Sequence, residues 1–131
     1  MTETNDLTQI GLSSKMHPHL EALKNDGYFS EMRDAYRFAI ALAIVKGGTP
    51  PELQKRQNIF ATPTVDPDGS LATAIHALMP CDEVPPYRWA ERLAEVGVEI
   101  LAAKSAQGKL DIGAMLAEAE RAAATDIPEM E

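Results

Sequence analysis

Acidic side chains at helical spacing are the first candidates for chemistry in this 131-residue sequence. Glu91, Glu95 and Glu99 stand four residues apart, so on a helix they form one ridge. Paired carboxylates can perform acid–base catalysis when burial drives their pKa values apart. Because Arg88 and Arg92 are interleaved with this ridge and nothing apolar surrounds it, the pattern instead predicts a solvated helix face.

The histidines and the single cysteine could supply a metal site or a nucleophile. A zinc site needs about four ligands at defined geometry, whereas His17, His19 and His76 are scattered and Cys81 stands alone. Cys81 as a nucleophile would need a base, and His76 lies upstream across Pro80 without an evident third group to orient it. We therefore expect solvated histidines, a plain thiol, and no catalytic residue, metal or cofactor.

Asp66, Asp68 and Gly69 have the spacing that opens a calcium-binding loop. If Gly69 is the sixth residue of such a loop, Ile75 is the twelfth, where calcium needs a bidentate glutamate. With Pro67 in the second position, the same residues favour a type I turn. The sequence therefore predicts a turn here rather than a calcium site.

Charge and composition restrict the class of protein. The formal net charge is −8, which opposes general attraction to nucleic acid or to an anionic membrane. Residues 1–48 contribute about −1 and residues 49–131 about −7, so any DNA contact is expected in the N-terminal part. The sequence has no apolar run long enough to span a bilayer and no signal-peptide pattern, and its single cysteine fits a reducing compartment. We expect a cytoplasmic protein that does not enter membranes.

The elements that must position these residues are mostly helices. Residues 29–47 are predicted to form the central helix, with Ser30 as its cap and the apolar stretch 38–45 buried on all sides. A short strand is expected within residues 7–13, because Ile10 and Leu12 alternate with polar or small residues. A helix over residues 16–24 follows this strand.

The second half is predicted to be helical as well. Thr49 and Glu52 form a capping box that predicts a helix over residues 50–59, and a loop is expected over residues 61–69. Helices are predicted over 70–79, 87–106 and 112–124, the last capped by Asp111, and residues 81–86 form a linker. Small residues on the inner stripe of the 87–106 helix permit close approach of another helix: Ala90, Ala94 and Gly97.

These elements predict a mainly α fold in a single domain spanning residues 1–131. The expected architecture is a compact bundle of about five to six helices, with one short N-terminal strand that can pair in a dimer. Within the domain we expect a flexible tail (1–6), an N-terminal segment (7–47), a helical remainder (49–125) and an acidic tail (126–131).

The order of strand, short helix, tight break and long helix over residues 7–47 resembles a ribbon-helix-helix module. Ile10-Gly11-Leu12 is similar to the alternating strand of that family, and the stretch that starts at Ser30 is similar to the capped start of its second helix. The resemblance implies strand pairing between two chains, with outward strand residues in the DNA major groove. Carried over, the DNA-facing residues would be Gln9, Gly11 and Ser13, with Ser30 at phosphate. This sequence departs from the family, because no outward strand residue is charged.

A second resemblance covers roughly residues 15–102. The stretch from Phe29 to Leu42, the pair Lys55-Arg56, and the stretch from Ala90 to Leu101 are similar to small accessory proteins of bacterial DNA phosphorothioation and restriction systems. This resemblance implies a phage-defence context and no particular reaction.

Two functions therefore remain open. The first is a non-enzymatic accessory or protein-interaction protein, for which the second resemblance implies a DNA-modification or phage-defence system. It is expected to be a homodimer that can also bind a protein partner. The alternative is a ribbon-helix-helix type DNA-binding transcriptional regulator that uses its N-terminal strand. The expected interface residues combine strand, basic-ridge and aromatic positions: Ile10, Leu12, Arg33, Arg37, Tyr87 and Trp89.

Overall fold

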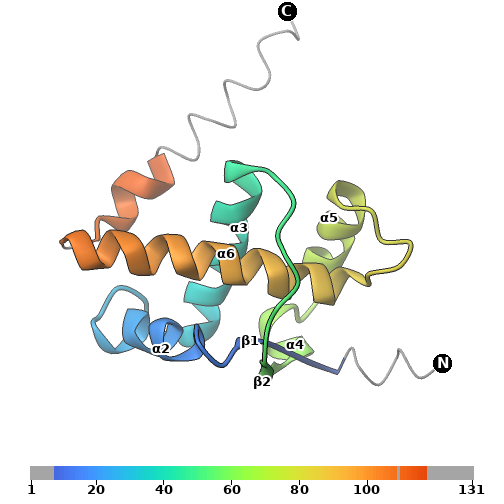
Figure 1. Ribbon diagram of the computed structural model, residues 1–131, viewed down its shortest axis with the longest axis horizontal. Helices are drawn as coiled ribbons and strands as arrows, with labels where there is room; N and C mark the ends of the chain where they lie inside the picture. Colours follow the sequence, from blue (N-terminus) through green and yellow to red (C-terminus); the bar gives the residue numbers. More distant parts are fainter. Residues whose placement is uncertain (1–7, 109, 118–131) are drawn as a thin grey trace, which may run out of the picture.

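The computed structural model describes residues 8–108 and 110–117, which form a mainly helical fold with one two-stranded sheet (Figure 1). The predicted fold class is therefore confirmed. No helix of these residues is long and apolar enough to cross a membrane. The elements are β1 (Gln9–Ser13), α2 (His17–Asn25), α3 (Met32–Lys46), β2 (Arg56–Ala61), α4 (Thr62–Val65), α5 (Ser70–Leu78), α6 (Pro86–Gln107) and a helical stretch over residues 112–117.

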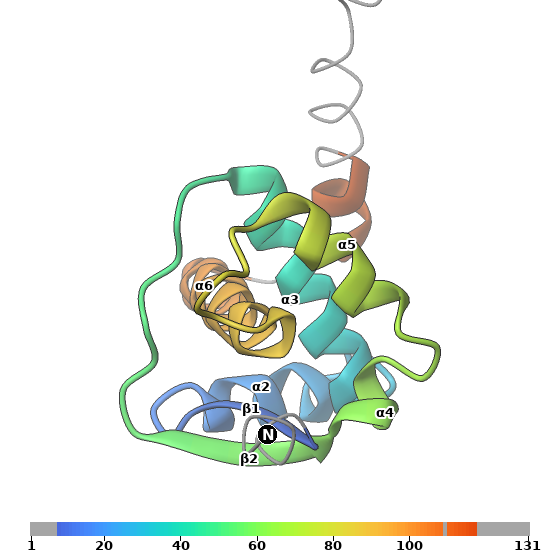
Figure 2. The same cartoon turned by 90° about the vertical axis from the view of Figure 1, so that its right-hand side faces the viewer.

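The core forms where α3 crosses α6, as Figures 1 and 2 show from two sides. The small residues predicted on one stripe of α6, Ala90, Ala94 and Gly97, are all buried. A Cβ atom built on Gly97 would lie only 2.0 Å from the carbonyl oxygen of Ala39 on α3. The close helix approach predicted from this stripe is confirmed, and it leaves no room for a side chain at position 97.

The central helix has one exposed side. It packs mainly on α6, α2 and α4, and Ala41, Val45 and Lys46 in its C-terminal half are exposed to solvent. Phe38 is only half-buried and Val45 is 42% exposed, so the prediction that residues 38–45 are buried on all sides is wrong. Ser30 does not cap the helix, because Glu31 occupies the N-cap position and no side chain caps it.

The two-stranded sheet contradicts the helix predicted over residues 50–59. Residues 50–59 were predicted to be helical, whereas β2 pairs antiparallel with β1 across the same chain. The capping signal of Thr49 and Glu52 involves only neighbouring residues. The two-stranded sheet of β1 and β2, which we call the ribbon, places the Phe60 ring edge-on against the Tyr36 ring, with 5.3 Å between the ring centres. Tertiary packing therefore overrides the local preference. The segment that joins α3 to β2 runs along the outside of the molecule past α6 (Figure 2).

The other predicted elements agree with the structure to within a few residues. The strand expected in residues 7–13 is β1, and the helices expected over 16–24, 70–79 and 87–106 are α2, α5 and α6. The expected loop 61–69 also contains the short helix α4. Asp111 accepts the Ala114 N–H at 2.9 Å, as a cap should. The predicted tails 1–6 and 126–131, and the last helix beyond residue 117, lie outside the described residues.

Gly97→Ala should destabilise the protein although alanine is the better helix former. Helix propensity alone favours the substitution by about 1 kcal/mol, but the new Cβ would overlap backbone atoms of Ala39 that cannot move without shifting α3. We expect a net loss of about 1–3 kcal/mol in the free energy of unfolding, measured by urea denaturation. Gly113→Ala is the matched control, because a Cβ there meets only ordinary contact at 3.5 Å. Equal stability of the two variants would contradict the packing.

Candidate functional site

The edge of β1 that faces away from β2 is covered by side chains of α6 and α3. The Gly11 N–H donates to Glu91 Oε2 at 2.9 Å, and the Tyr36 hydroxyl donates to the Gly11 carbonyl at 2.7 Å. The Ser13 N–H donates to Glu95 Oε1 at 3.2 Å, and Ser13 Oγ donates to Glu95 Oε2 at 2.6 Å. Side chains therefore satisfy the backbone groups that a neighbouring strand would otherwise bind.

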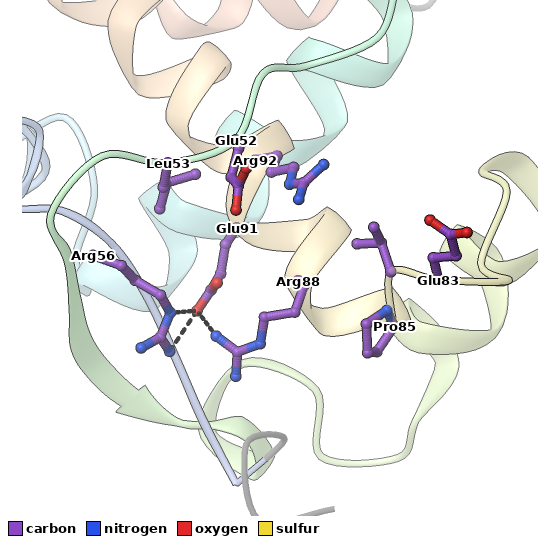
Figure 3. Close-up of a pocket in the computed structure, with 9 residues that line it drawn as sticks. Glu52, Leu53, Arg56, Glu83, Pro85, Arg88, Glu91 and Arg92 are labelled. Atoms are coloured by element: carbon purple, nitrogen blue, oxygen red, sulfur yellow. Dashed lines mark hydrogen bonds and ion pairs between the residues drawn. The ribbon is translucent and has the colours of Figure 1, made fainter. Parts of the chain in front are cut away.

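Glu91 is the centre of this arrangement. It is 2% exposed, and its Oε2 accepts from Arg56 Nε, Arg56 Nη2 and Arg88 Nη1, each at 2.6 Å. The two guanidinium groups approach it from different sides, one from β2 and one from α6 (Figure 3). Both also donate to the Gln9 carbonyl, at 2.8 Å from Arg88 and 3.3 Å from Arg56. We call Glu91, Arg56 and Arg88 the Glu91 cluster.

The solvated glutamate ridge predicted from sequence is wrong for two of its three members. Glu91 is buried and Glu95 is half-buried, whereas Glu99 alone is exposed. The pairing of Arg88 with Glu91 one helical turn later was visible in the sequence. The other partners, Gly11 and Arg56, are distant along the chain, so no local pattern indicates them.

Burial also fixes the protonation of Tyr36. This residue is fully buried, and burial, followed by the nearby negative charge of Glu91, raises the pKa of its hydroxyl well above the ordinary value. The hydroxyl therefore stays protonated and keeps donating to the Gly11 carbonyl.

The strand residues predicted to face DNA do not all face outward. Gly11 and Ser13 are buried against α6, which corrects that expectation, while Gln9 is exposed. A Cβ atom on Gly11 would lie 1.7 Å from the Gln57 carbonyl oxygen, at the irregularity in the ribbon between positions 10 and 11. Ser30 is exposed and lies before the start of α3.

The predicted interface residues divide into core and surface. Ile10 and Leu12 are fully buried within the chain itself, and Trp89 is 5% exposed, with its Nε1–H donating to the Pro80 carbonyl at 2.9 Å. Arg33 and Arg37 are exposed on α3. Tyr87 is half-buried and donates to Asp66.

The remaining candidates for chemistry hold the fold together. The Asp66 carboxylate accepts the N–H groups of Leu71 and Ala72 at the start of α5, at 2.9 and 3.0 Å, and the Tyr87 hydroxyl at 2.8 Å. Burial and the contact with Asp66 raise the pKa of Tyr87 to about 12.

Burial and the neighbouring Asp82 raise the pKa of Cys81 above its ordinary value, which opposes a reactive thiolate.

The outer edge of β2 is open, in contrast to that of β1. Asn58 lies opposite Gly11, whose N–H and C=O both point away from β2. In an antiparallel pair, residues in that position both turn their backbone groups away from each other. The Asn58 N–H and C=O therefore point to the outer edge of β2, and within the described residues the sheet contains no further strand there.

A pocket of about 290 Å³ adjoins the Glu91 cluster on the side of α6 (Figure 3). We call it the arginine pocket, since three of its lining residues are arginines. Its walls come from the segment before β2, the linker before α6, and α6 itself. The lining residues are Glu52, Leu53, Arg56, Glu83, Val84, Pro85, Arg88, Glu91 and Arg92.

Comparison of the chain with protein-family models, with curated proteins and with solved structures finds no match.

Glu91→Ala should strongly destabilise the protein, because the partly buried guanidinium groups of Arg56 and Arg88 lose the carboxylate that they bind. Breaking a buried ion pair from one side costs about 3–5 kcal/mol, and the Gly11 N–H loses its acceptor as well. Urea denaturation should show this loss in the free energy of unfolding.

Glu99→Ala is the matched control for that measurement, because Glu99 belongs to the same ridge of α6 but is exposed. It should change the stability by less than about 0.5 kcal/mol. Similar effects at the two positions would mean that Glu91 does not organise the ribbon.

Proposed function

We propose that this chain is a non-enzymatic accessory protein that acts through protein–protein contacts, and that its first partner is a second copy of itself. The observation that carries the proposal is the asymmetry of the ribbon. One edge is closed by Glu91, Glu95 and Tyr36, whereas the backbone groups of β2 at the other edge have no neighbouring strand in the described residues.

An open strand edge favours strand addition. Unpaired N–H and C=O groups on an edge bind another extended segment, and proteins usually block such edges with proline or charged residues when pairing is unwanted. β2 contains no proline, and its only charged side chain, Arg56, is turned back to Glu91. β2 therefore lacks these means of blocking its edge.

A second copy suits this edge because β2 can pair with itself. In an antiparallel arrangement about a two-fold axis near Asn58, Arg56 of one copy lies towards the Ala61 end of the other copy's β2, so the two arginines do not face each other. The pairing would extend each two-stranded ribbon into a four-stranded sheet across the dimer.

Light scattering after size-exclusion chromatography, over a range of protein concentrations, tests this contact. The parent chain should reach twice the monomer mass. Asn58→Pro should remain a monomer with a native circular dichroism spectrum, because proline removes an N–H on the outer edge and none that faces β1.

The matched control is Asn58→Ala, which keeps the backbone N–H and should dimerise as the parent does. A monomeric parent at every concentration, or a dimeric Asn58→Pro variant, would refute the proposed contact.

The wider context of the proposal follows from the resemblance to accessory proteins of DNA phosphorothioation and restriction systems, and includes a cytoplasmic location. The regulator alternative needs pairing between the β1 strands of two chains. In this chain β1 has β2 on one side and side chains of α6 and α3 on the other. Salt-sensitive binding of duplex DNA with a Kd near ~1 μM would nevertheless favour a regulator over an accessory protein.

A further inference from the structure

Three large apolar side chains are exposed among the described residues, and all belong to helices at the same end of the molecule. Val45 is 42%, Leu78 58% and Leu116 48% exposed. Val45 and Leu78 lie in the last turns of α3 and α5, and Leu116 lies in the helical stretch 112–117. Figures 1 and 2 both show these two helix ends and this stretch at the upper end of the molecule, opposite the ribbon. We call Val45, Leu78 and Leu116 the apolar end.

The charges around the apolar end favour a cationic partner. Both α3 and α5 end here, and the last carbonyl groups of a helix carry partial negative charge. Asp82 is exposed four residues after Leu78. Residues 118–131 follow the stretch that contains Leu116, and their five Asp or Glu against one Arg give a net charge of −4. Lys46, the last residue of α3, is the opposing charge.

The same charges oppose other occupants of an apolar surface. A second copy would bring its own net charge of −8 and the same helix C-termini to a contact made by this end, so like charges would meet. An anionic membrane would repel the chain for the same reason. A helix with Lys or Arg on both sides of an apolar stripe combines the opposite charge with side chains that can cover the apolar end.

We propose that the apolar end docks a cationic amphipathic helix of a partner protein. The apolar stripe of that helix covers Val45, Leu78 and Leu116, and its flanking Lys or Arg side chains meet the negative charge of the helix C-termini and of residues 118–131. This inference rests on the proposal that the chain acts through protein–protein contacts, and it names the chemistry of a partner other than a second copy. The ribbon lies at the opposite end, so the two surfaces can be occupied together.

Fluorescence anisotropy with the full-length chain tests this contact. The probe is a fluorescein-labelled peptide of leucine and lysine, about 18 residues or roughly five helical turns long, with its leucines on one helix face. We expect saturable binding with a Kd of ~10 μM, weakened by added sodium chloride. Two control peptides should bind at least ~10-fold more weakly. One has the same composition with its leucines spread around the helix, and the other keeps the leucine stripe but has glutamate in place of lysine.

Variants of the chain locate the contact. Leu78→Gln should weaken binding of the probe at least ~10-fold, and its stability to urea should match that of the parent because the side chain is 58% exposed. His19→Gln is the matched control, since it places the same side chain at an exposed position of α2, near the ribbon, and should leave the Kd unchanged. Glu118→Gln combined with Glu120→Gln should weaken binding roughly 3-fold through the lost charge.

An unchanged Kd in Leu78→Gln, or equal binding of the two leucine–lysine peptides, would overturn the proposal. It would also be overturned if phosphatidylglycerol vesicles bind the parent but not Leu78→Gln, which would assign the apolar end to a membrane. A smaller oligomer in Leu78→Gln than in the parent would overturn it in favour of a second copy. The β2 contact is tested separately, because Asn58→Pro leaves the apolar end intact and should bind the probe as the parent does.

Discussion

The structure depends on one requirement, which is that the backbone of β1 must be satisfied on both sides. One side is paired with β2, as in any sheet. On the other side the described residues contain no strand, and the Glu91 carboxylate and the Tyr36 hydroxyl bind the two backbone groups of Gly11 there. Because these groups come from α6 and α3, the same contacts that close the strand edge also join the ribbon to the two crossed helices of the core.

Burying a carboxylate to close a strand edge costs free energy, and the partners of the Glu91 carboxylate offset that cost. Removing Glu91 from water carries a desolvation penalty of several kcal/mol, which only close and well-directed partners repay. Here two guanidinium groups and one backbone N–H surround a single oxygen. An apolar side chain could fill the same space but could not bind the N–H of Gly11, so the charge also fixes which strand residue lies over α6.

Sequence reasoning succeeded where the deciding interactions are local and failed where they are distant. The small stripe around Gly97 predicted a close helix contact, because spacing along a helix determines which residues share a face. The capping signal at Thr49 was outweighed by strand pairing of residues 56–61 with residues 9–13. The ridge at Glu91 looked solvated because neither Arg56 nor Gly11 is near it in the sequence. The arginine pocket was missed for the same reason.

The separation between Gly11 and Glu91 also determines when the fold can be completed. These residues are 80 positions apart, and Ser13 and Glu95 are 82 apart. On the ribosome, β1 is therefore made about 80 residues before the carboxylates that close its edge. Contacts across such distances close large loops and form late. The strand β1 is therefore among the last of the described elements to be finished, and until α6 is complete both edges of the ribbon are exposed to other chains.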